Sequence, residues 1–408
     1  MPRSPSTHVG GGGAGGRSHD TPGTSGAFTR GVFLRALQPS IFSTISALAR
    51  AHGAVNLGQG FPDFAPDPGL VDRFVYHLRH SSNQYAPMAG VPSLLEAIAR
   101  KIRRVQGVDV DPQAEITVTS GATQGLWTAI QSVVEPGDEV ILFDPAYDSY
   151  APAVESRGGR VTAINLVGPD FRIDWAGFAE RLKSRPRLVI INNPHNPTGR
   201  CLRHADLLEL ERLLAPTDTL LLSDEVYEHL VYDGREHLSV LRYPKLRERA
   251  LVTSSFGKTF HVTGWKVGYV VAPPELMRRF RQLHQFTVFT VNTPAQYAIA
   301  DQLAEPAHYE GLPGFLAAKR DLLARALAPS KFKLLPSEGS YFVLADYSAV
   351  SDEPDGRFAE RLITEHGVAT IPISGFYREA PPGQRYVRLC FAKEEATLEA
   401  GAQRLLVV

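Results

Sequence analysis

The chain has 408 residues, of which 43% are hydrophobic and 21% charged, and this composition excludes a wholly disordered protein. Lys and Arg total 43, as do Asp and Glu, so the chain lacks the overall basic charge that favours nucleic-acid binding. No apolar run approaches the roughly 18 residues of a membrane helix, and the two cysteines, which cannot build a disulfide framework, favour a reducing compartment such as the cytoplasm.

Residues 1–27 differ in composition from the rest of the chain. Eight of them are Gly, seven are Ser or Thr and three are Pro. Such a segment buries too little apolar surface to offset the entropy of ordering it, and it lacks the continuous apolar region of a secretory signal. We therefore expect a disordered tail. An organelle transit peptide, to which Arg3, Arg17 and Arg30 would contribute basic charge, is the alternative.

From about residue 28 the hydrophobic pattern is that of a globular protein. Ile41, Ile45 and Leu48 lie near helical spacing and predict a helix over 34–50. Between about residues 116 and 272, short apolar runs alternate with helical stretches, which predicts a mostly parallel sheet covered by helices on both faces. These runs are 116–119, 140–143, 188–191, 219–222, 251–253 and 267–271.

A second α/β region is predicted after about residue 305. Strands are expected at 340–344 and 385–391, and a helix near 357–366. The length of the chain suggests two or three structural units, and no repeat of solenoid or propeller length divides it.

Polar or glycine-rich loops follow five of the apolar runs directly. In an open α/β sheet, ligands bind beyond the carboxyl ends of the strands. The five loops are therefore expected to converge on one ligand. They are Ser120–Thr123, Asp144–Tyr147, Asn192–Gly199, Ser223–Tyr227 and Ser254–Lys258.

The first of these loops has the features of a phosphate cradle. Gly121 permits close approach of the backbone, and a helix is predicted to begin there, whose first N–H groups can bind an anion. The alternative is an ordinary helix start, capped by Ser120 or Thr123 without a ligand.

Asp224 ends an apolar run and is therefore expected to be partly buried. A buried carboxylate needs a cationic partner, and a protonated ring nitrogen would serve. Tyr227, three residues later, could face the same ligand. Alternatively, Asp224 caps a helix that begins at Glu225.

Two basic residues are candidates for chemistry. Lys258 lies between Gly257 and an aromatic, glycine-containing stretch, and a desolvated lysine is a nucleophile toward carbonyl groups; an exposed surface charge is the alternative. Arg388, flanked by apolar residues on a predicted strand, could pair with an internal acid or bind a carboxylate through two hydrogen bonds. No Cys-x-x-Cys or His-Glu-x-x-His pattern indicates a zinc site.

Taken together, these motifs resemble the class I/II family of pyridoxal-phosphate-dependent aminotransferases, which have the fold-type-I architecture. Within that family the chain most resembles bacterial methionine aminotransferase and its kynurenine–glutamine transaminase relatives, through residues 55–64 and 83–87. The resemblance extends from about residue 30 to 405. The motifs that carry it are Asn193–Gly199, Ser223–Tyr227, Ser255–Thr259, Gly264–Gly268 and Arg388–Phe391.

This resemblance implies an α/β fold with two domains. The large domain, over residues 61–305, would bind pyridoxal 5'-phosphate and contain a mostly parallel seven-stranded sheet between helices. The small α/β domain would combine residues 28–60 with residues 306–408. Homodimers with shared active sites are also implied.

The family implies how the cofactor would be held. Lys258 would form the internal aldimine and then shuttle the 1,3-proton on the way to a ketimine, and Asp224 would pair with the pyridine N–H⁺. Tyr227 and Asn196 would hydrogen-bond the phenolic oxygen, and Tyr147 would stack on the ring. The phosphate would be bound by Gly121, the backbone of Ala122 and Thr123, Ser255, Lys266 and Tyr85 of the partner subunit.

The implied activity is transamination between an apolar or aromatic L-amino acid, methionine first, and a 2-oxo acid. Arg388 would bind the α-carboxylate of the substrate, assisted by Gly60 and Asn196. A β-lyase acting on cysteine conjugates and a regulator without activity are the alternatives, but the chain shows no attached DNA-binding module. An apolar side-chain pocket could be lined by Phe42, Phe61, Tyr85, Tyr147 and Phe286.

Overall fold

The computed structural model describes residues 40–80 and 83–408. The tail expected over 1–27 lies outside this part of the chain, as do residues 34–39 of the first predicted helix. That helix, α1 (Ile41–Ala51), is preceded by Ser40, whose side chain accepts a hydrogen bond from the Phe42 amide and so caps the helix.

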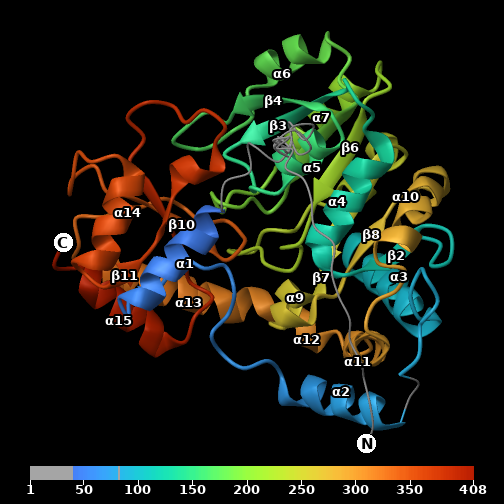
Figure 1. Cartoon of the computed structure of the whole chain (residues 1–408), viewed down its shortest axis with the longest axis horizontal. Helices are drawn as coiled ribbons and strands as arrows, with labels where there is room; N and C mark the ends of the chain where they lie inside the picture. Colours follow the sequence, from blue (N-terminus) through green and yellow to red (C-terminus); the bar gives the residue numbers. More distant parts are fainter. Residues whose placement is uncertain (1–39, 81–82) are drawn as a thin grey trace, which may run out of the picture. The chain divides into compact units, whose positions relative to one another are not determined.

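A seven-stranded sheet is built from strands between residues 116 and 271, in the order β2-β8-β7-β6-β5-β3-β4 (Figure 1). All six runs predicted in this region form strands. They are β2 (Ile116–Thr119), β3 (Glu139–Asp144), β5 (Leu188–Asn192), β6 (Leu220–Asp224), β7 (Ala250–Ser255) and β8 (Gly268–Val271). The seventh strand, β4 (Arg160–Asn165), was not predicted as an apolar run, because it lies at the edge of the sheet and its side chains are half-buried or exposed.

The sheet is mostly parallel, as predicted. Strands β4, β3, β5, β6 and β7 run parallel to one another, whereas β8 is antiparallel to both of its neighbours, β2 and β7. The carboxyl ends of β2, β3, β5, β6 and β7 therefore share one edge with the amino end of β8. This reversal brings the residues just before Gly268 to the edge where the polar loops follow the other strands.

Helices cover both faces of this sheet (Figure 1). Along β3, Val140 and Leu142 belong to one core cluster with α4, α5 and α10, while Ile141 and Phe143 belong to the other core. This alternation explains why the central strands are apolar on both faces. The helices of this region are α2 (Pro68–His80), α3 (Pro92–Gln106), α4 (Gly121–Val133), α5 (Tyr150–Ser156), α6 (Trp175–Leu182), α7 (His204–Leu214), α8 (Pro244–Arg247), α9 (Phe256–Thr259), α10 (Pro274–Thr287) and α11 (Thr293–Leu303); short 3₁₀ turns are η2 (Val240–Arg242) and η3 (Thr263–Trp265).

The C-terminal region contains a four-stranded antiparallel sheet, in the order β12-β13-β10-β9. Its strands are β9 (Lys333–Leu334), β10 (Phe342–Asp346), β12 (Ile371–Pro372) and β13 (Tyr386–Cys390). The helices and the 3₁₀ turn around it are α12 (Ala307–Glu310), α13 (Leu312–Leu327), α14 (Asp355–Thr364), α15 (Glu395–Leu405) and η4 (Ile373–Phe376). The two strands and the helix that the sequence predicts here are thus present.

The N-terminal segment joins this region through β1 (Val55–Asn56), which pairs in parallel with β11 (Val368–Ala369). Ile45 and Ala49 of α1 pack in one core cluster with Ile363 of α14. The predicted domain boundaries at residues 60 and 305 stay a prediction. Within residues 40–80 and 83–408, no helix is long and apolar enough to cross a membrane.

Candidate active site

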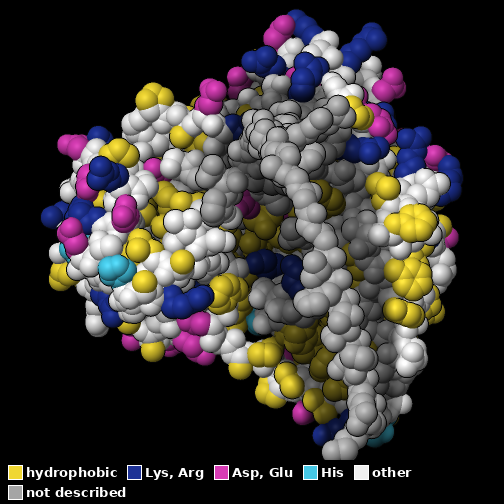
Figure 2. Space-filling model, viewed as in Figure 1, with side chains coloured by type: hydrophobic (Ala, Val, Ile, Leu, Met, Phe, Trp, Pro, Cys, Tyr) yellow, Lys and Arg dark blue, Asp and Glu magenta, His cyan; other side chains and the backbone are white. Residues whose placement is uncertain are grey.

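A cavity of about 490 Å³ lies where the polar edge of the large sheet meets the C-terminal region. In Figure 2, Lys or Arg side chains lie recessed among hydrophobic ones near the centre of the view. All but one of the site residues predicted from the sequence line this cavity: Gly60, Gly121, Ala122, Thr123, Tyr147, Asn196, Asp224, Tyr227, Ser255, Lys258, Lys266 and Arg388. The expected convergence of the loops is therefore present.

Tyr85 is the predicted site residue that does not line the cavity. Its side chain is 83% exposed, and its contact with the phosphate of a partner subunit stays a prediction. Among the residues suggested for an apolar side-chain pocket, Phe42 and Tyr147 line the cavity. Phe61 and Phe286 are exposed instead and do not line it.

Helix α4 begins at the cavity and presents its first N–H groups there. Gly121 has φ +71°, and a Cβ atom at this position would lie 3.2 Å from Lys266 Nζ. A Cβ on Gly268 would come within 2.6 Å of Ser254 O and 3.0 Å of the Ala122 amide nitrogen. Because these two glycines lack a Cβ atom, the Lys266 ammonium and the first turn of α4 can lie close to each other. Together they form a positively charged site that suits an anion such as a phosphate.

The alternative of an ordinary capped helix start does not match these contacts. Ser120 occupies the N-cap position of α4, but its side chain makes no capping hydrogen bond. Its amide donates instead to Gln124 Oε1 at 2.9 Å. The backbone N–H groups that follow thus donate no hydrogen bond to the Ser120 side chain.

Asp224 lies at the carboxyl end of β6 and is only 3% exposed. Its Oδ2 accepts a hydrogen bond from the Tyr150 hydroxyl at 2.6 Å, and its Oδ1 accepts one from the Val226 amide at 3.2 Å. No helix begins at Glu225, so the capping alternative is wrong; residues 226–229 form a turn. Burial raises the pKa of Asp224 to about 6, as expected for a carboxylate without a paired cation.

We expect Asp224 to make the cofactor-free protein less stable as the pH rises. The pKa of Asp224 is about 6 in the folded chain against an ordinary 3.8, so the folded state holds the proton more tightly between these values. Its contribution to the free energy of unfolding is fully present below pH 4 and is lost through pH 6, by about 3 kcal/mol at most.

Urea unfolding from pH 4 to pH 7 measures this effect as the difference between the wild type and Asp224→Asn. The subtraction is needed because other carboxylates also contribute to the pH dependence of stability. Among them is Glu228, whose pKa falls from an ordinary 4.5 to about 2 in the folded chain, because the charges of Lys101, His229 and His237 and the hydrogen bond from Lys101 together outweigh burial. A difference that does not vary with pH would contradict the raised pKa of Asp224.

Lys258 lies on the short helix α9, which directly follows β7. Its Nζ donates a hydrogen bond to Gly60 O at 2.7 Å and lies 5.6 Å from the centre of the Tyr227 ring. Desolvation lowers the pKa of Lys258 to about 8. A larger fraction of neutral amine is therefore present near pH 7 than for an exposed lysine, as a nucleophile or base requires. The surface-charge alternative is wrong.

Arg388 is 1% exposed on β13, and its guanidinium reaches the cavity. Nη1 donates to Asn196 Oδ1 and Nη2 to Gly58 O, both at 2.7 Å, while the buried Nε has no partner. Within the described residues Arg388 forms no ion pair, so the internal-acid alternative is not realised there. Burial lowers the pKa of Arg388 to about 10, and a ligand carboxylate would compensate this desolvated charge.

Several residues at the site have no role in the sequence analysis, and three of them contact predicted site residues. Tyr150 is the hydrogen-bond donor to Asp224. Asn192 lines the cavity, and its Oδ1 accepts from the Asn196 amide at 2.7 Å. The Phe342 ring centre lies 3.8 Å from the Arg388 guanidinium carbon. The position of Tyr150, shortly after the loop that follows β3, was the available signal, but nothing in the sequence pairs it with Asp224.

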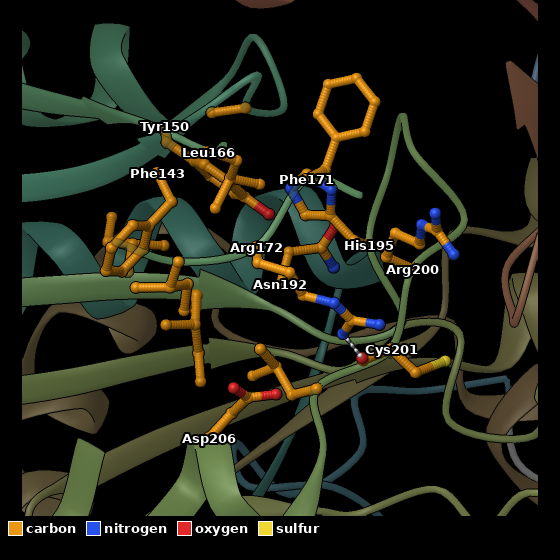
Figure 3. Close-up of a pocket in the computed structure, with 15 residues that line it drawn as sticks. Phe143, Tyr150, Leu166, Phe171, Arg172, Asn192, His195, Arg200, Cys201 and Asp206 are labelled. Atoms are coloured by element: carbon orange, nitrogen blue, oxygen red, sulfur yellow. Dashed lines mark hydrogen bonds between the residues drawn. The ribbon is translucent and has the colours of Figure 1, made fainter. Parts of the chain in front are cut away.

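A second cavity is lined in part by Asn192 and Tyr150 (Figure 3). Its volume is only about 40 Å³, which is enough for one water molecule rather than a substrate. Phe143, Leu166 and Phe171 make much of its lining apolar, and we regard it as a packing void that supports the larger site.

The similarity of this chain to known proteins extends over nearly all of its described residues. The model of the family "Aminotransferase class I and II" matches residues 53–405. The chain is 52% identical over 373 residues to methionine aminotransferase of Escherichia coli (strain K12), covering 91% of this chain and 96% of that protein. It is 36% identical over 392 residues to kynurenine–oxoglutarate transaminase 1 of Mus musculus, covering 88% and 92%.

The architecture also matches a solved structure. A crystal structure from Escherichia coli, reported together with a methionine aminotransferase function, has a TM-score of 0.90 and 51% sequence identity to this chain. The match covers 92% of this chain and 98% of that one.

Proposed function

Because the chain belongs to the class I and II aminotransferases, a family of fold-type-I enzymes that depend on pyridoxal phosphate, we propose that it binds pyridoxal 5'-phosphate and uses it to transaminate apolar or aromatic L-amino acids, methionine first. The amino group passes to a 2-oxo acid. The 52% identity to a methionine aminotransferase supports the choice of methionine.

The residues around the cavity suit this cofactor. The cradle of Gly121, the Ala122 and Thr123 amides, Ser255 and Lys266 would hold its phosphate. Buried Asp224 would pair with a protonated ring nitrogen, which supplies the cation that this carboxylate lacks.

The remaining contacts would fix the ring. Tyr147 would lie against its face, and Tyr227 with Asn196 would hydrogen-bond its phenolic oxygen. When bound, the cofactor supplies an electron-withdrawing ring that accepts electrons from the substrate.

The protein's own groups would orient the substrate and move its proton. Arg388 would bind the α-carboxylate through charge-assisted hydrogen bonds, with Gly60 and Asn196 beside it. Lys258 Nζ, with its lowered pKa, would take the proton from the substrate Cα and return it during the transfer.

One observation carries this proposal: a desolvated amine, a buried acid and an arginine without a paired acid share a cavity with an anion cradle. Each of these features is unfavourable in the empty protein, and each suits a different group of an amino acid joined to pyridoxal phosphate. A structural protein has no evident use for all of them in one place.

A screen of the first half-reaction tests the proposal. Protein loaded with pyridoxal 5'-phosphate is mixed with each amino acid in turn, and the loss of its visible absorption is followed. We expect methionine to react fastest and aromatic amino acids next. No reaction with any amino acid would overturn the proposal, and release of pyruvate and ammonia from a cysteine conjugate without an acceptor would favour the β-lyase alternative.

We further propose that the active form is a homodimer in the cytoplasm. Tyr85 and Phe286 are 83% and 87% exposed, and the Tyr85 and Phe289 rings lie 5.5 Å apart. Exposed aromatic groups of this kind favour an interface. Cys201 and Cys390 are buried free thiols, in keeping with a reducing compartment.

A further inference from the structure

One carboxylate in the active-site cavity has no role in the proposed chemistry. Among the described residues, two carboxylates line the cavity, Asp148 and Asp224. Asp224 is assigned to the cofactor ring. Asp148 follows Tyr147 in the loop after β3 and is half-buried.

Asp148 has no ion-pair partner in the described part of the chain, although it attracts the Arg388 guanidinium and so opposes the lowering of that group's pKa by burial. Its Oδ2 accepts a hydrogen bond from the Ser40 hydroxyl at 2.5 Å. Burial raises the pKa of Tyr147, and the charge of Asp148 raises it further. The carboxylate thus contributes a negative potential to this part of the cavity wall.

Each cationic side chain of the cavity already has a role in the proposed function. Of the described residues, Lys258, Lys266 and Arg388 are the lysines and arginines that line it. Lys266 lies against the anion cradle, Lys258 serves the reacting carbon, and Arg388 serves the α-carboxylate. A second carboxylate on the substrate would therefore find no free cation, and it would meet the charge of Asp148.

The surroundings of Asp148 suit an uncharged side chain. Phe42 and Tyr147 contribute aromatic surface to the same cavity, and Ser40 and Gln59 contribute polar groups. A carboxylate oxygen in such surroundings accepts hydrogen bonds from N–H groups and repels other carboxylates.

We propose that Asp148 determines the substrate class of this enzyme by excluding amino acids and 2-oxo acids whose side chains carry a carboxylate. Side chains that are uncharged, or that end in an N–H donor, are accepted. This inference rests on the proposed function, because it assumes that Arg388 binds the α-carboxylate in this cavity.

Glutamine and glutamate provide the test, because their side chains have the same shape and differ in charge and in N–H donors. We measure kcat/KM for both with the wild-type holoenzyme and with Asp148→Asn. The ratio of glutamine to glutamate is expected to fall by about tenfold or more in the variant, since a like-charge contact is removed. Asp72→Asn, which removes an exposed carboxylate on α2, is the matched control and should leave the ratio unchanged.

A binding measurement provides a readout without turnover. Pentanoate and glutarate have the same chain length, and glutarate carries a second carboxylate. Calorimetry on the wild-type holoenzyme should show weaker binding of glutarate, and Asp148→Asn should reduce the difference. Even if the variant fails to fold, equal binding of pentanoate and glutarate by the wild type would still overturn the proposal.

The outcomes separate the two proposals. If the wild type does not transaminate methionine, the proposed function fails. If it transaminates methionine but treats glutamine and glutamate alike, or binds pentanoate and glutarate equally, the role of Asp148 is overturned. An unchanged glutamine-to-glutamate ratio in a folded Asp148→Asn protein would overturn it too.

Discussion

Replacing Lys258 by alanine is expected to reduce transamination by roughly 10⁴-fold or more, because the change removes both the nucleophilic amine and the base. The amine lies 2.7 Å from Gly60 O in a cavity that lowers its pKa to about 8. Turnover of methionine with a 2-oxo acid measures the loss. The absorption spectrum of added pyridoxal 5'-phosphate should also differ from that of the wild-type complex.

The matched control for this variant is Lys333→Ala, which removes an exposed lysine on β9. It should leave turnover and spectrum unchanged. Thermal unfolding of both variants checks that the fold is retained. Turnover within tenfold of the wild type in a folded Lys258→Ala protein would contradict the role assigned to this lysine and, with it, the proposed function.

Replacing Arg388 by alanine is expected to lower kcat/KM about 10²- to 10³-fold for every amino acid, mainly through KM, because all of them carry the α-carboxylate. The guanidinium donates to Asn196 and Gly58 and keeps its buried Nε without a partner. Arg388→Lys keeps the charge but not the planar pair of donors. It should recover only part of the loss.

Steady-state kinetics on methionine, phenylalanine and glutamine measure this effect. Arg385→Ala is the control, because Arg385 precedes the same strand and pairs with Asp352 rather than with the cavity. A loss confined to one substrate would show that Arg388 contacts a side chain instead of the common carboxylate.

Much of the site was predictable because its polar residues come directly after buried apolar strands in this chain. The apolar runs of β5 and β6 are buried on both faces, and their ends carry Asn192 and Asp224, which are paired in the sheet register. The loops after parallel strands must meet at one edge, so the predicted convergence did not depend on distant contacts. The roles of the individual residues came from the family motifs, which lie at those same loops.

The sequence by itself determined which segments are buried and where polar loops follow them, since the spacing of hydrophobic residues and the local composition both depend on burial. The direction of β8, which brings Lys266 to the anion cradle, was decided only by tertiary structure. So were the bond of Tyr150 to Asp224, the bond of Ser40 to Asp148 and the contacts of Arg388 with Asn196 and Gly58. Their partners lie 74 to 330 residues apart in the chain, and local periodicity carries no information about which distant groups fold against one another.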